Sequence, residues 1–442
     1  MGTPVIVIGG GLAGCEAAWQ LARRGVPVRL FEMKPKRFSP AHSSEFMAEL
    51  VCSNSLRSDQ IHNAVGLLHE EMRRLGSLVL WAADRHRVPA GNALAVDREL
   101  FARSISERVA AQPEIEIVNQ EVTSLPEGLA IVATGPLTSE KLADSIQGLC
   151  GDALYFYDSI APTVYADSLD MQKIFRASRW EDADAGGDYL NIPLSREEYY
   201  AFVDEVARAE KMPLHRFEAA HYFEGCLPIE VMAQRGPDTL SFGPMKPVGL
   251  RDPRTGTTAF AVVQLRQEDK LGTLYNLVGF QTRMRIGEQK RILRSLPGMG
   301  KAVFARFGSV HRNTFIRSPS LLSSHLEHRQ RPGLYFAGQI VGVEGYVESA
   351  ALGLLAGVHV AFRVRDALAP LPPPTTAHGA LLRYLAEASP KHFQPMNINY
   401  GLLPPLVKGD RRTPKRERNL QLSARALREL KAYAEAVLPT TA

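Results

Sequence analysis

The sequence predicts an α/β protein in which a Rossmann-like domain with a parallel sheet is interrupted by an inserted mixed α/β domain. Three observations support this prediction. An apolar run, a glycine-rich turn and a run of small and apolar residues open the chain from Val5 onward. Between about Tyr155 and Phe280 the pattern changes to β-branched and aromatic stretches, and a short apolar run with a glycine-rich segment returns at Gly333. A length of 442 residues suits two or three domains of this kind.

The first part of the chain reads as a β-turn-α-turn-β unit. The continuous apolar run Val5–Ile8 is typical of a buried parallel strand. Small and apolar residues over 14–24 predict a helix, and residues 28–32 predict the next strand. The further elements predicted in this part are a helix over 98–111, capped by Asp97, and strands over 115–118 and 129–133.

The inserted part is marked by strand-like stretches and by one clear helix start. Thr163–Tyr165 and Ala259–Val263 read as strands, and Ser195 with Glu198 forms a capping box for a helix. After it, residues 333–337 predict a strand and residues 338–357 a loop leading into a helix; an amphipathic helix follows over about 420–437. We therefore expect a cofactor-binding domain in two parts, 1–150 and 326–442, around an inserted substrate domain, 151–325.

Composition excludes several protein classes. Hydrophobic residues make up 45% and charged residues 22%, which is ordinary for a globular protein. The four cysteines have neither disulfide-framework nor zinc-site spacing, and we expect no metal. No signal-peptide pattern or membrane-length apolar run is present, so a cytoplasmic protein without a membrane span is expected. The net charge of +5 permits an anionic partner without requiring one.

The strongest motif is the glycine-rich turn between the first strand and the first helix. Glycines let the backbone turn tightly and approach a pyrophosphate, and a helix N-terminus offers N–H groups to its oxygens. Glu32 ends the second strand, where an acid accepts hydrogen bonds from a ribose 2′-hydroxyl and repels a 2′-phosphate. The dinucleotide-binding residues predicted here are Gly9, Gly10, Gly11, Leu12, Ala13, Gly14 and Glu32.

Two later segments favour FAD over NAD as the resident dinucleotide. An apolar strand ends at Thr134 and Gly135, as in two-part FAD domains, and the segment with Gly338 and Gln339 could bring a third backbone loop to the ribityl chain. The chain has no second strand-GxGxxG-helix unit. A nicotinamide reductant is therefore expected to bind only transiently.

Two cysteines lie in polar, turn-like sequence. Cys52 is surrounded by serine and asparagine, and Cys226 lies between a glycine and a Leu-Pro pair. Such surroundings can stabilise a thiolate, although each position also fits an inert buried thiol. Cys15 reads as a packing residue. His62 and His69 are expected on one face of a helix over 61–75, and no carboxylates complete a metal site there.

The basic run near the C-terminus leaves two interpretations open. It contains Lys408, Arg411, Arg412, Lys415, Arg416 and Arg418 against Asp410 and Glu417. A solvated surface segment and a contact to nucleic-acid phosphates both fit this pattern.

Five segments together resemble a known family: Gly9–Ala18, Val51–Leu56, Gly225–Glu230, Gly243–Gly249 and Gly338–Ala350. The chain is similar to the folate- and FAD-dependent tRNA (uracil-5-)-methyltransferases, relatives of the glucose-inhibited division protein A group. The resemblance implies an enzyme that forms 5-methyluridine in the T-loop of tRNA. Methylene-tetrahydrofolate would be the carbon donor, reduced FAD the methylene carrier and hydride source, and NAD(P)H the reductant.

The resemblance also implies roles for individual residues. Cys226 would be the nucleophile that adds to uracil carbon 6, and Cys52 would assist as general base or protect the flavin adduct. Tyr346 is a candidate contact of the flavin ring, and His69 a candidate for stacking on the folate pterin. Arg283, Arg285, Lys290 and the C-terminal basic run could form the tRNA surface.

Other activities also fit parts of the sequence. A wobble-uridine-modifying tRNA flavoprotein is less favoured, because the long C-terminal extension of those relatives is absent. A small-substrate FAD/NAD(P)H oxidoreductase would be indifferent to tRNA, and a non-catalytic tRNA-binding protein would bind without flavin reduction. The sequence does not indicate the oligomeric state.

Overall fold

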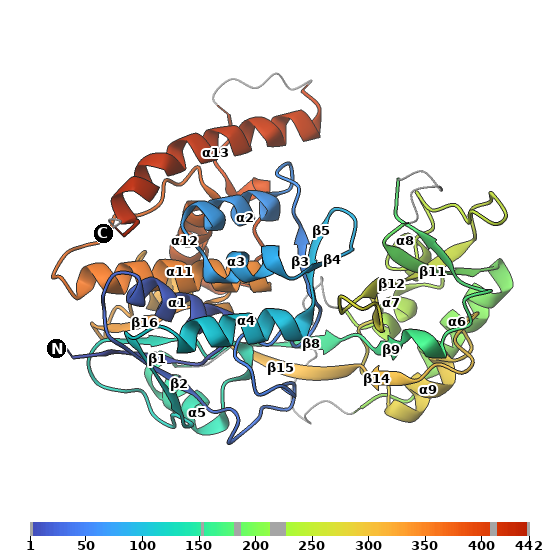
Figure 1. The fold of residues 1–442 in the computed structure, drawn as a ribbon, viewed down its shortest axis with the longest axis horizontal. Helices are drawn as coiled ribbons and strands as arrows, with labels where there is room; N and C mark the ends of the chain where they lie inside the picture. The colour runs from blue at the N-terminus through green and yellow to red at the C-terminus, as the bar shows by residue number, and fades with distance from the viewer. Residues whose placement is uncertain (1–2, 152–153, 181–186, 213–226, 407–412, 440–442) are drawn as a thin grey trace.

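A computed structural model describes residues 3–151, 154–180, 187–212, 227–406 and 413–439 of the chain. These residues build two large hydrophobic cores, and the chain passes between them through an antiparallel ribbon of β8 (Leu154–Ile160) and β15 (Ser309–Phe315) (Figure 1). The first core draws on both ends of the chain and the second on its middle. The predicted α/β class is confirmed.

The first core contains a five-stranded sheet whose neighbouring strands are all parallel, in the order β16-β7-β1-β2-β6. From β1 the chain moves outward through β2 to β6, and then returns to the other side of β1 through β7 and β16. The order therefore reverses between β1 and β7, where open α/β sheets bind ligands beyond their carboxyl ends. The strands are β1 (Val5–Ile8), β2 (Val28–Glu32), β6 (Ile115–Asn119), β7 (Ala130–Val132) and β16 (Leu334–Phe336).

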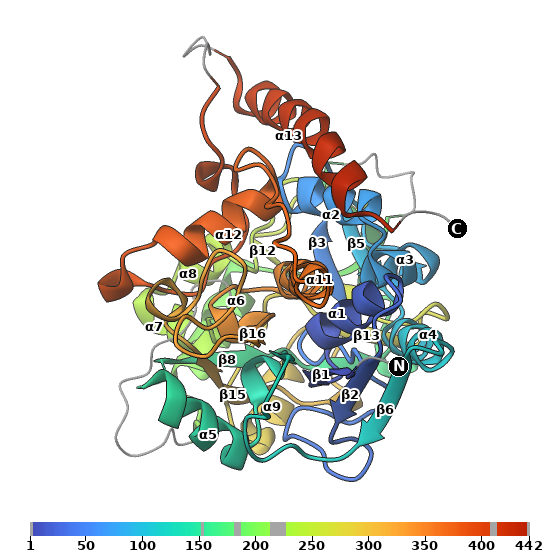
Figure 2. The same cartoon turned by 90° about the vertical axis from the view of Figure 1, so that its left-hand side faces the viewer.

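Helices α1 (Leu12–Ala22) and α11 (Tyr346–Arg363) lie side by side in the first core (Figure 2). A Cβ atom at Gly353 would lie 2.2 Å from the carbonyl oxygen of Ala13, and one at Gly357 would lie 2.6 Å from that of Ala17. Only glycine allows such close backbone approach. This close packing brings α11, which comes near the end of the chain, against α1, the first helix.

The other helices of the first core cover the sheet and the start of α11. Asp97 caps α4 by accepting a hydrogen bond from the backbone N–H of Leu100 (3.0 Å), as the sequence predicts. A small sheet of order β3-β5-β4 adjoins them, and α13 lies against α2 (Figures 1 and 2). The remaining elements are α2 (Ala64–Arg74), α3 (Leu78–Arg85), α4 (Arg98–Ala110), α5 (Glu140–Cys150), α10 (Ser318–Leu321), α12 (Ala377–Glu387), α13 (Lys415–Val437), β3 (Ser55–Ser58), β4 (Arg87–Val88) and β5 (Ala93–Val96).

The second core is built on a six-stranded antiparallel sheet, in the order β10-β11-β12-β13-β9-β14. The predicted capping box is present. The Ser195 hydroxyl accepts a hydrogen bond from the backbone N–H of Glu198, and the Glu198 carboxylate accepts one from the backbone N–H of Ser195. The elements are β9 (Thr163–Tyr165), β10 (Phe175–Ala177), β11 (Tyr189–Leu194), β12 (Ala261–Gln267), β13 (Leu274–Leu277), β14 (Phe304–Arg306), α6 (Arg196–Arg208), α7 (Ile229–Arg235), α8 (Thr239–Phe242) and α9 (Ile286–Leu293).

Two predicted helix starts are wrong: α13 begins at Lys415 and not near Leu420, and the start of α2 also differs. Helix α2 begins at Ala64, so His62 lies in the preceding turn and does not share a helix face with His69. The cap position is Asn63, whose side chain makes no capping hydrogen bond. Ile61 continues the helical spacing of Val65 and Leu68 upstream of this position, so the start was predicted too early.

Candidate active site

The glycine-rich turn between β1 and α1 forms one side of a pocket at the switch point of the parallel sheet. Gly9 has a φ of +102°, and a Cβ there would lie 2.7 Å from the carbonyl oxygen of Ala133. A Cβ at Gly14 would lie only 1.8 Å from the carbonyl oxygen of Gly9. At Gly11, by contrast, a Cβ meets no atom within 4 Å, and this N-cap has no side-chain hydrogen bond. The backbone N–H groups at this helix start therefore face space that a pyrophosphate can fill.

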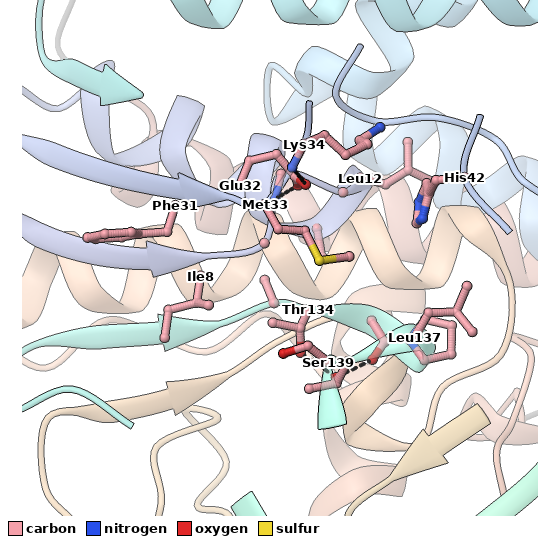
Figure 3. A pocket seen from close by; sticks show the side chains of 18 of the residues that line it. Ile8, Leu12, Phe31, Glu32, Met33, Lys34, His42, Thr134, Leu137 and Ser139 are labelled. Atoms are coloured by element: carbon pink, nitrogen blue, oxygen red, sulfur yellow. Dashed lines mark hydrogen bonds between the residues drawn. The ribbon is translucent and has the colours of Figure 1, made fainter. Parts of the chain in front are cut away.

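Glu32 lies at the carboxyl end of β2 and points into the same pocket (Figure 3). Its Oε2 accepts a hydrogen bond from the backbone N–H of Gly10 (2.7 Å), and its Oε1 accepts one from that of Lys34 (2.9 Å). A carboxylate has about four acceptor positions, so both oxygens keep capacity for a further donor. The carboxylate is thus held in place and can still accept from a ribose hydroxyl.

The opposite side of the pocket comes from the turn after β7 and from the segment after β16. In Figure 3, Thr134 and Ser139 lie across the pocket from Glu32. The hydroxyls of Thr134 and Thr138 are 2.6 Å apart, and Gly135 has a φ of +65°. Gln339 also lines the pocket, and its side-chain amide donates to a carboxylate oxygen of Glu344 (2.7 Å).

The pocket thus joins three segments that are far apart in the sequence. Gly14 and Gly338 do not line it; they permit close packing behind the lining, since a Cβ at Gly338 would lie 2.7 Å from the Cβ of Ala13. The predicted dinucleotide-binding residues that line the pocket are Gly9, Gly10, Gly11, Leu12, Ala13, Glu32, Thr134, Gly135, Gln339 and Tyr346.

The loop that leads to Cys52 crosses the glycine-rich turn. The backbone N–H of Ala48 donates to the carbonyl of Gly10 (2.8 Å), and that of Met47 donates to the Ser106 hydroxyl (2.9 Å). Two residues further on, the buried carboxylate of Glu49 pairs with the buried ammonium of Lys34 (3.4 Å). These hydrogen bonds and this ion pair place the Cys52 loop, residues 50–54, beside the pocket.

Tyr346 connects this loop to α11. Its phenolic oxygen accepts hydrogen bonds from the backbone N–H groups of Cys52 (2.7 Å) and Ser53 (3.2 Å). Burial, and then the neighbouring Cys52, raise the pKa of Tyr346 well above its usual range, so the phenol stays protonated. Tyr346 also lines the pocket, where a flavin ring contact was expected.

Two arginines bind backbone carbonyls of the Cys52 loop. The Arg98 guanidinium donates to the carbonyl of Leu50 and also to the Glu268 carboxylate (2.6 Å). Arg306 comes from β14 of the second core and donates to the carbonyl of Val51 (2.9 Å). The loop is therefore held by side chains from both cores.

A third arginine, Arg266 of β12, binds side chains of the same loop. It donates to the Ser53 hydroxyl and to the Asn54 side-chain carbonyl, each at 2.9 Å. The Asn54 amide in turn donates to the carbonyls of Val96 and Gln267, each at 2.9 Å. Sequence reasoning missed all three arginines; the only signal was that Asn54 belongs to one of the matched segments.

The other cysteines have different surroundings. Cys15 is fully buried, its thiol lies 3.3 Å from the carbonyl of Gly10, and burial raises its pKa far above the usual value, which fits a packing role. Burial also raises the pKa of Cys150, to about 11. Cys226, the predicted nucleophile, lies outside the described residues.

The expected role of His69 needs correction. His69 is completely buried in α2, its Nδ1 lies 2.9 Å from the Asp59 carboxylate and its Nε2 lies 3.1 Å from the carbonyl of Leu56. It does not line the pocket. With no exposed ring face, His69 cannot stack on a pterin in this conformation, and it instead connects α2 to β3.

The described part of the chain holds neither a metal-binding cluster nor a membrane-length helix. No group of three or more His, Cys, Asp or Glu side chains within these ranges is placed to hold a metal ion. None of the helices described there is both long and apolar enough to cross a bilayer.

The features of the pocket fit FAD. An uncapped helix start faces open space at Gly11, a carboxylate stands at the end of β2, and a third segment contributes Gln339 and Tyr346 to the pocket lining. The Cys52 loop lies beside Tyr346, through the backbone N–H of Cys52, and Val51 of this loop lines the pocket, whereas Cys52 itself does not.

Comparison with known proteins identifies relatives along nearly the whole chain. The profile of a family described as "Glucose inhibited division protein A" matches residues 4–367. A Geobacter sulfurreducens protein named methylenetetrahydrofolate–tRNA-(uracil-5-)-methyltransferase TrmFO is 58% identical over 427 residues, which cover 96% of this chain and 98% of that protein. Proteins of the same name from Desulforudis audaxviator and Pelotomaculum thermopropionicum are each 55% identical, covering 97% and 99% of this chain and 98% and 100% of theirs.

Solved structures show the same fold at much lower identity. Two crystal forms of Aquifex aeolicus GidA superpose with TM-scores of 0.70 and 0.67 at 18% identity. The alignments cover 98% of this chain and 74% and 77% of those chains.

Proposed function

The chain belongs to the glucose-inhibited division protein A family, and from this premise we propose that it is a methylenetetrahydrofolate–tRNA-(uracil-5-)-methyltransferase. One observation carries the proposal: relatives with this name are 55–58% identical over almost their full length. The enzyme forms 5-methyluridine in the T-loop of tRNA and takes the carbon from methylenetetrahydrofolate. Because its substrate is tRNA, we place it in the cytoplasm.

The pocket residues bind FAD in this proposal. The N-terminal backbone of α1 binds the pyrophosphate, and Glu32 accepts hydrogen bonds from the ribose hydroxyls. When bound, FAD supplies the transfer of the one-carbon unit and of the hydride, with NAD(P)H as a transient reductant. The Glu32 carboxylate disfavours a 2′-phosphate at that position by charge repulsion.

Two cysteines activate the uracil ring. The Cys226 thiolate adds to carbon 6, and the electron pair of the 5,6 double bond moves into the ring enolate, which makes carbon 5 nucleophilic. After carbon 5 has bonded to the one-carbon unit, Cys52 removes the proton at carbon 5. Once that unit has received its hydride and become the methyl group, the thiolate leaves carbon 6 and the 5,6 double bond re-forms. The Cys226 role rests on its motif alone, whereas Cys52 stands on a loop held beside the pocket.

Tyr346 and the three arginines position Cys52. The Tyr346 oxygen accepts hydrogen bonds from two backbone N–H groups of the loop. Arg98, Arg306 and Arg266 bind residues next to Cys52. Fixing a reacting group in this way lowers the entropic cost of reaching the transition state.

The test is a methylation assay with tRNA that lacks T-loop methylation. We expect labelled carbon to pass from methylenetetrahydrofolate to tRNA and none to pass from S-adenosylmethionine. Cys226→Ala should abolish transfer while the flavin absorbance is retained, and Cys150→Ala, at the end of α5, should keep both. Label derived from S-adenosylmethionine would refute the function, and normal turnover by Cys226→Ala would refute the assigned nucleophile.

A further inference from the structure

A second hollow lies on the first core, between the start of α13, β3, the start of α2 and the turn at residues 398–401. We call it the α13 groove and define it by six of the polar residues that line it: Arg57, Ser58, Asn63, Asn399, Lys415 and Arg418. It shares no lining residue with the dinucleotide pocket. Nothing in the function proposed above uses it.

The charge of this groove has one sign. Arg57, Lys415 and Arg418 line it, and none of its described lining residues is an aspartate or glutamate. Lys415 and Arg418 are exposed, and neither forms an ion pair with any residue that the structure describes. The other lining groups include amides and hydroxyls, which can donate hydrogen bonds to phosphate oxygens.

Other arginines expected to contact tRNA are already close to carboxylates. Arg285 pairs with Glu210 (3.3 Å), and the Arg283 guanidinium lies 4.0 Å from the Glu230 carboxylate. Lys415 and Arg418 are therefore better available to an external anion than Arg283 and Arg285.

The walls of the groove are fixed by direct hydrogen bonds. The Asn419 amide of α13 donates to the carbonyl of His62 (3.0 Å), and the Ser423 hydroxyl donates to that of Ile61 (2.7 Å). The Tyr400 hydroxyl lies 2.6 Å from the same carbonyl of Ile61. Since these hydrogen bonds tie α13 to the turn before α2, the groove is preformed rather than assembled on binding.

Arg57 connects the groove to the active site. It has a φ of +68°, a rare conformation for a non-glycine residue, and its guanidinium pairs with the fully buried carboxylate of Glu348. Glu348 lies in the first turn of α11, two residues after Tyr346. Arg57 is also five residues from Cys52, a stretch that spans at most about 17 Å. An RNA strand bound in the groove would therefore be within a few nucleotides of the reacting base.

We propose that the α13 groove binds backbone phosphates of the tRNA substrate next to the target uridine. The inference rests on the proposed function, because it names the surface by which that active site receives its RNA. The interaction is independent of base identity, since the exposed cations present charge and not a base-reading pattern.

The test compares charge variants of α13 in the full-length protein. In Lys415→Glu/Arg418→Glu we expect affinity for an unmodified tRNA transcript to fall at least tenfold, as measured by filter binding at several salt concentrations. The slope of log affinity against log salt should become shallower by about 0.7 for each phosphate that the variant no longer neutralises. The KM for tRNA should rise, while the KM for methylenetetrahydrofolate and the flavin spectrum stay unchanged.

Two controls make the result specific. Arg428→Glu reverses an exposed charge on the same helix outside the groove and should bind tRNA as the wild type does. Lys415→Gln/Arg418→Gln removes the charges without adding new ones, and should show the same direction of change if the double glutamate variant folds poorly.

Several outcomes would overturn the proposal. Wild-type affinity and salt slope in both double variants would do so, as would an equal loss of affinity in Arg428→Glu. A rise in the KM for methylenetetrahydrofolate alone would assign the groove to the folate. If the wild type bound tRNA through these residues but never methylated it, the proposed function would fail while the phosphate site remained.

Discussion

The glycine-rich turn and the Cys52 loop lie side by side at one pocket but are held in different ways. The turn between Gly9 and Gly14 is shaped by its own sequence, because positive φ and the absence of Cβ atoms let it fold back on itself and on Ala133. The Cys52 loop has no such local determinant. Its backbone and side chains are bound by Tyr346 from α11, by Arg98 from α4, and by Arg266 and Arg306 from the second sheet.

This difference separates cofactor binding from chemistry. A dinucleotide site of this kind needs one β-turn-α unit and a later segment of the same core. The reactive loop depends on both cores being in place, since Arg266 and Arg306 reach it from the second one. We therefore expect damage to the turn to remove the cofactor, and damage to the supports of the loop to slow the reaction while FAD stays bound.

The largest effect is expected from Gly14→Ala. A Cβ at this position would lie 1.8 Å from the carbonyl oxygen of Gly9, so the turn must open. We expect loss of bound flavin, measured by absorbance of the purified protein, and loss of all methylation.

Gly148→Ala is the matched control. Gly148 lies within α5, and a Cβ there meets no atom within 4 Å. Alanine should be neutral or stabilise the helix by up to about 1 kcal/mol. Full flavin content in Gly14→Ala would show that the turn tolerates displacement. Cofactor binding would then not depend on the local shape of this turn.

An intermediate effect is expected from Tyr346→Phe. The ring remains, but the backbone N–H groups of Cys52 and Ser53 lose their acceptor. Leaving buried donors without partners costs about 1–3 kcal/mol each. We expect kcat to fall by about 10–100-fold, measured by steady-state methylation, with flavin content unchanged.

Tyr433→Phe serves as its control. The Tyr433 hydroxyl of α13 is buried and has no hydrogen-bond partner among the described residues, so removing it should leave kcat as in the wild type. If Tyr346→Phe lost bound flavin while its kcat per bound flavin stayed unchanged, Tyr346 would support the cofactor and not the Cys52 loop.

The smallest effect concerns His359, in the middle of α11, the helix that carries Tyr346 and packs against α1. Burial, and then the neighbouring His325, lower the pKa of His359 to about 3. Below its ordinary pKa near 6.5, the unfolded chain binds a proton that the folded protein excludes. The free energy of unfolding should therefore fall as pH decreases from about 6.5 toward 3, by at most about 1.4 kcal/mol per pH unit.

Urea unfolding at pH 5 and pH 7 tests this sign. His359→Gln should show a smaller loss of stability between the two pH values than the wild type. His392→Gln, at an exposed position, should keep the wild-type difference. An unchanged difference in His359→Gln would mean that this ring does not contribute to the pH dependence.

Elements with local signals were predictable from the sequence. The first β-turn-α-turn-β unit, the Asp97 cap and the Ser195–Glu198 capping box depend on residues within a few positions of one another. The pairing of β15 with β8 was not predictable, because it joins Ser309 to Ile160 through hydrogen bonds that no short pattern records. The start of α2 was misplaced because Ile61 continues the helical spacing of Val65 and Leu68 upstream of the cap position.

The site residues, too, were predictable only where the signal is local in the sequence. Glu32 and Thr134 were found because strand ends next to a glycine-rich turn have a fixed place in this fold. Arg98, Arg266 and Arg306 were missed because they bind backbone carbonyls and polar side chains far away in the sequence. Nothing near these arginines distinguishes them from surface arginines, so only the folded chain shows their role.

The seating of α11 against α1 sets the order of events during synthesis. Ile8 and Ser349 line the same pocket, and the second core lies between them in the chain. On the ribosome, the N-terminal half-site must wait for the whole middle of the chain and for the glycines of α11 to emerge. Cofactor loading is therefore a late event in biogenesis, and a nascent chain cut short before α11 would have an incomplete pocket.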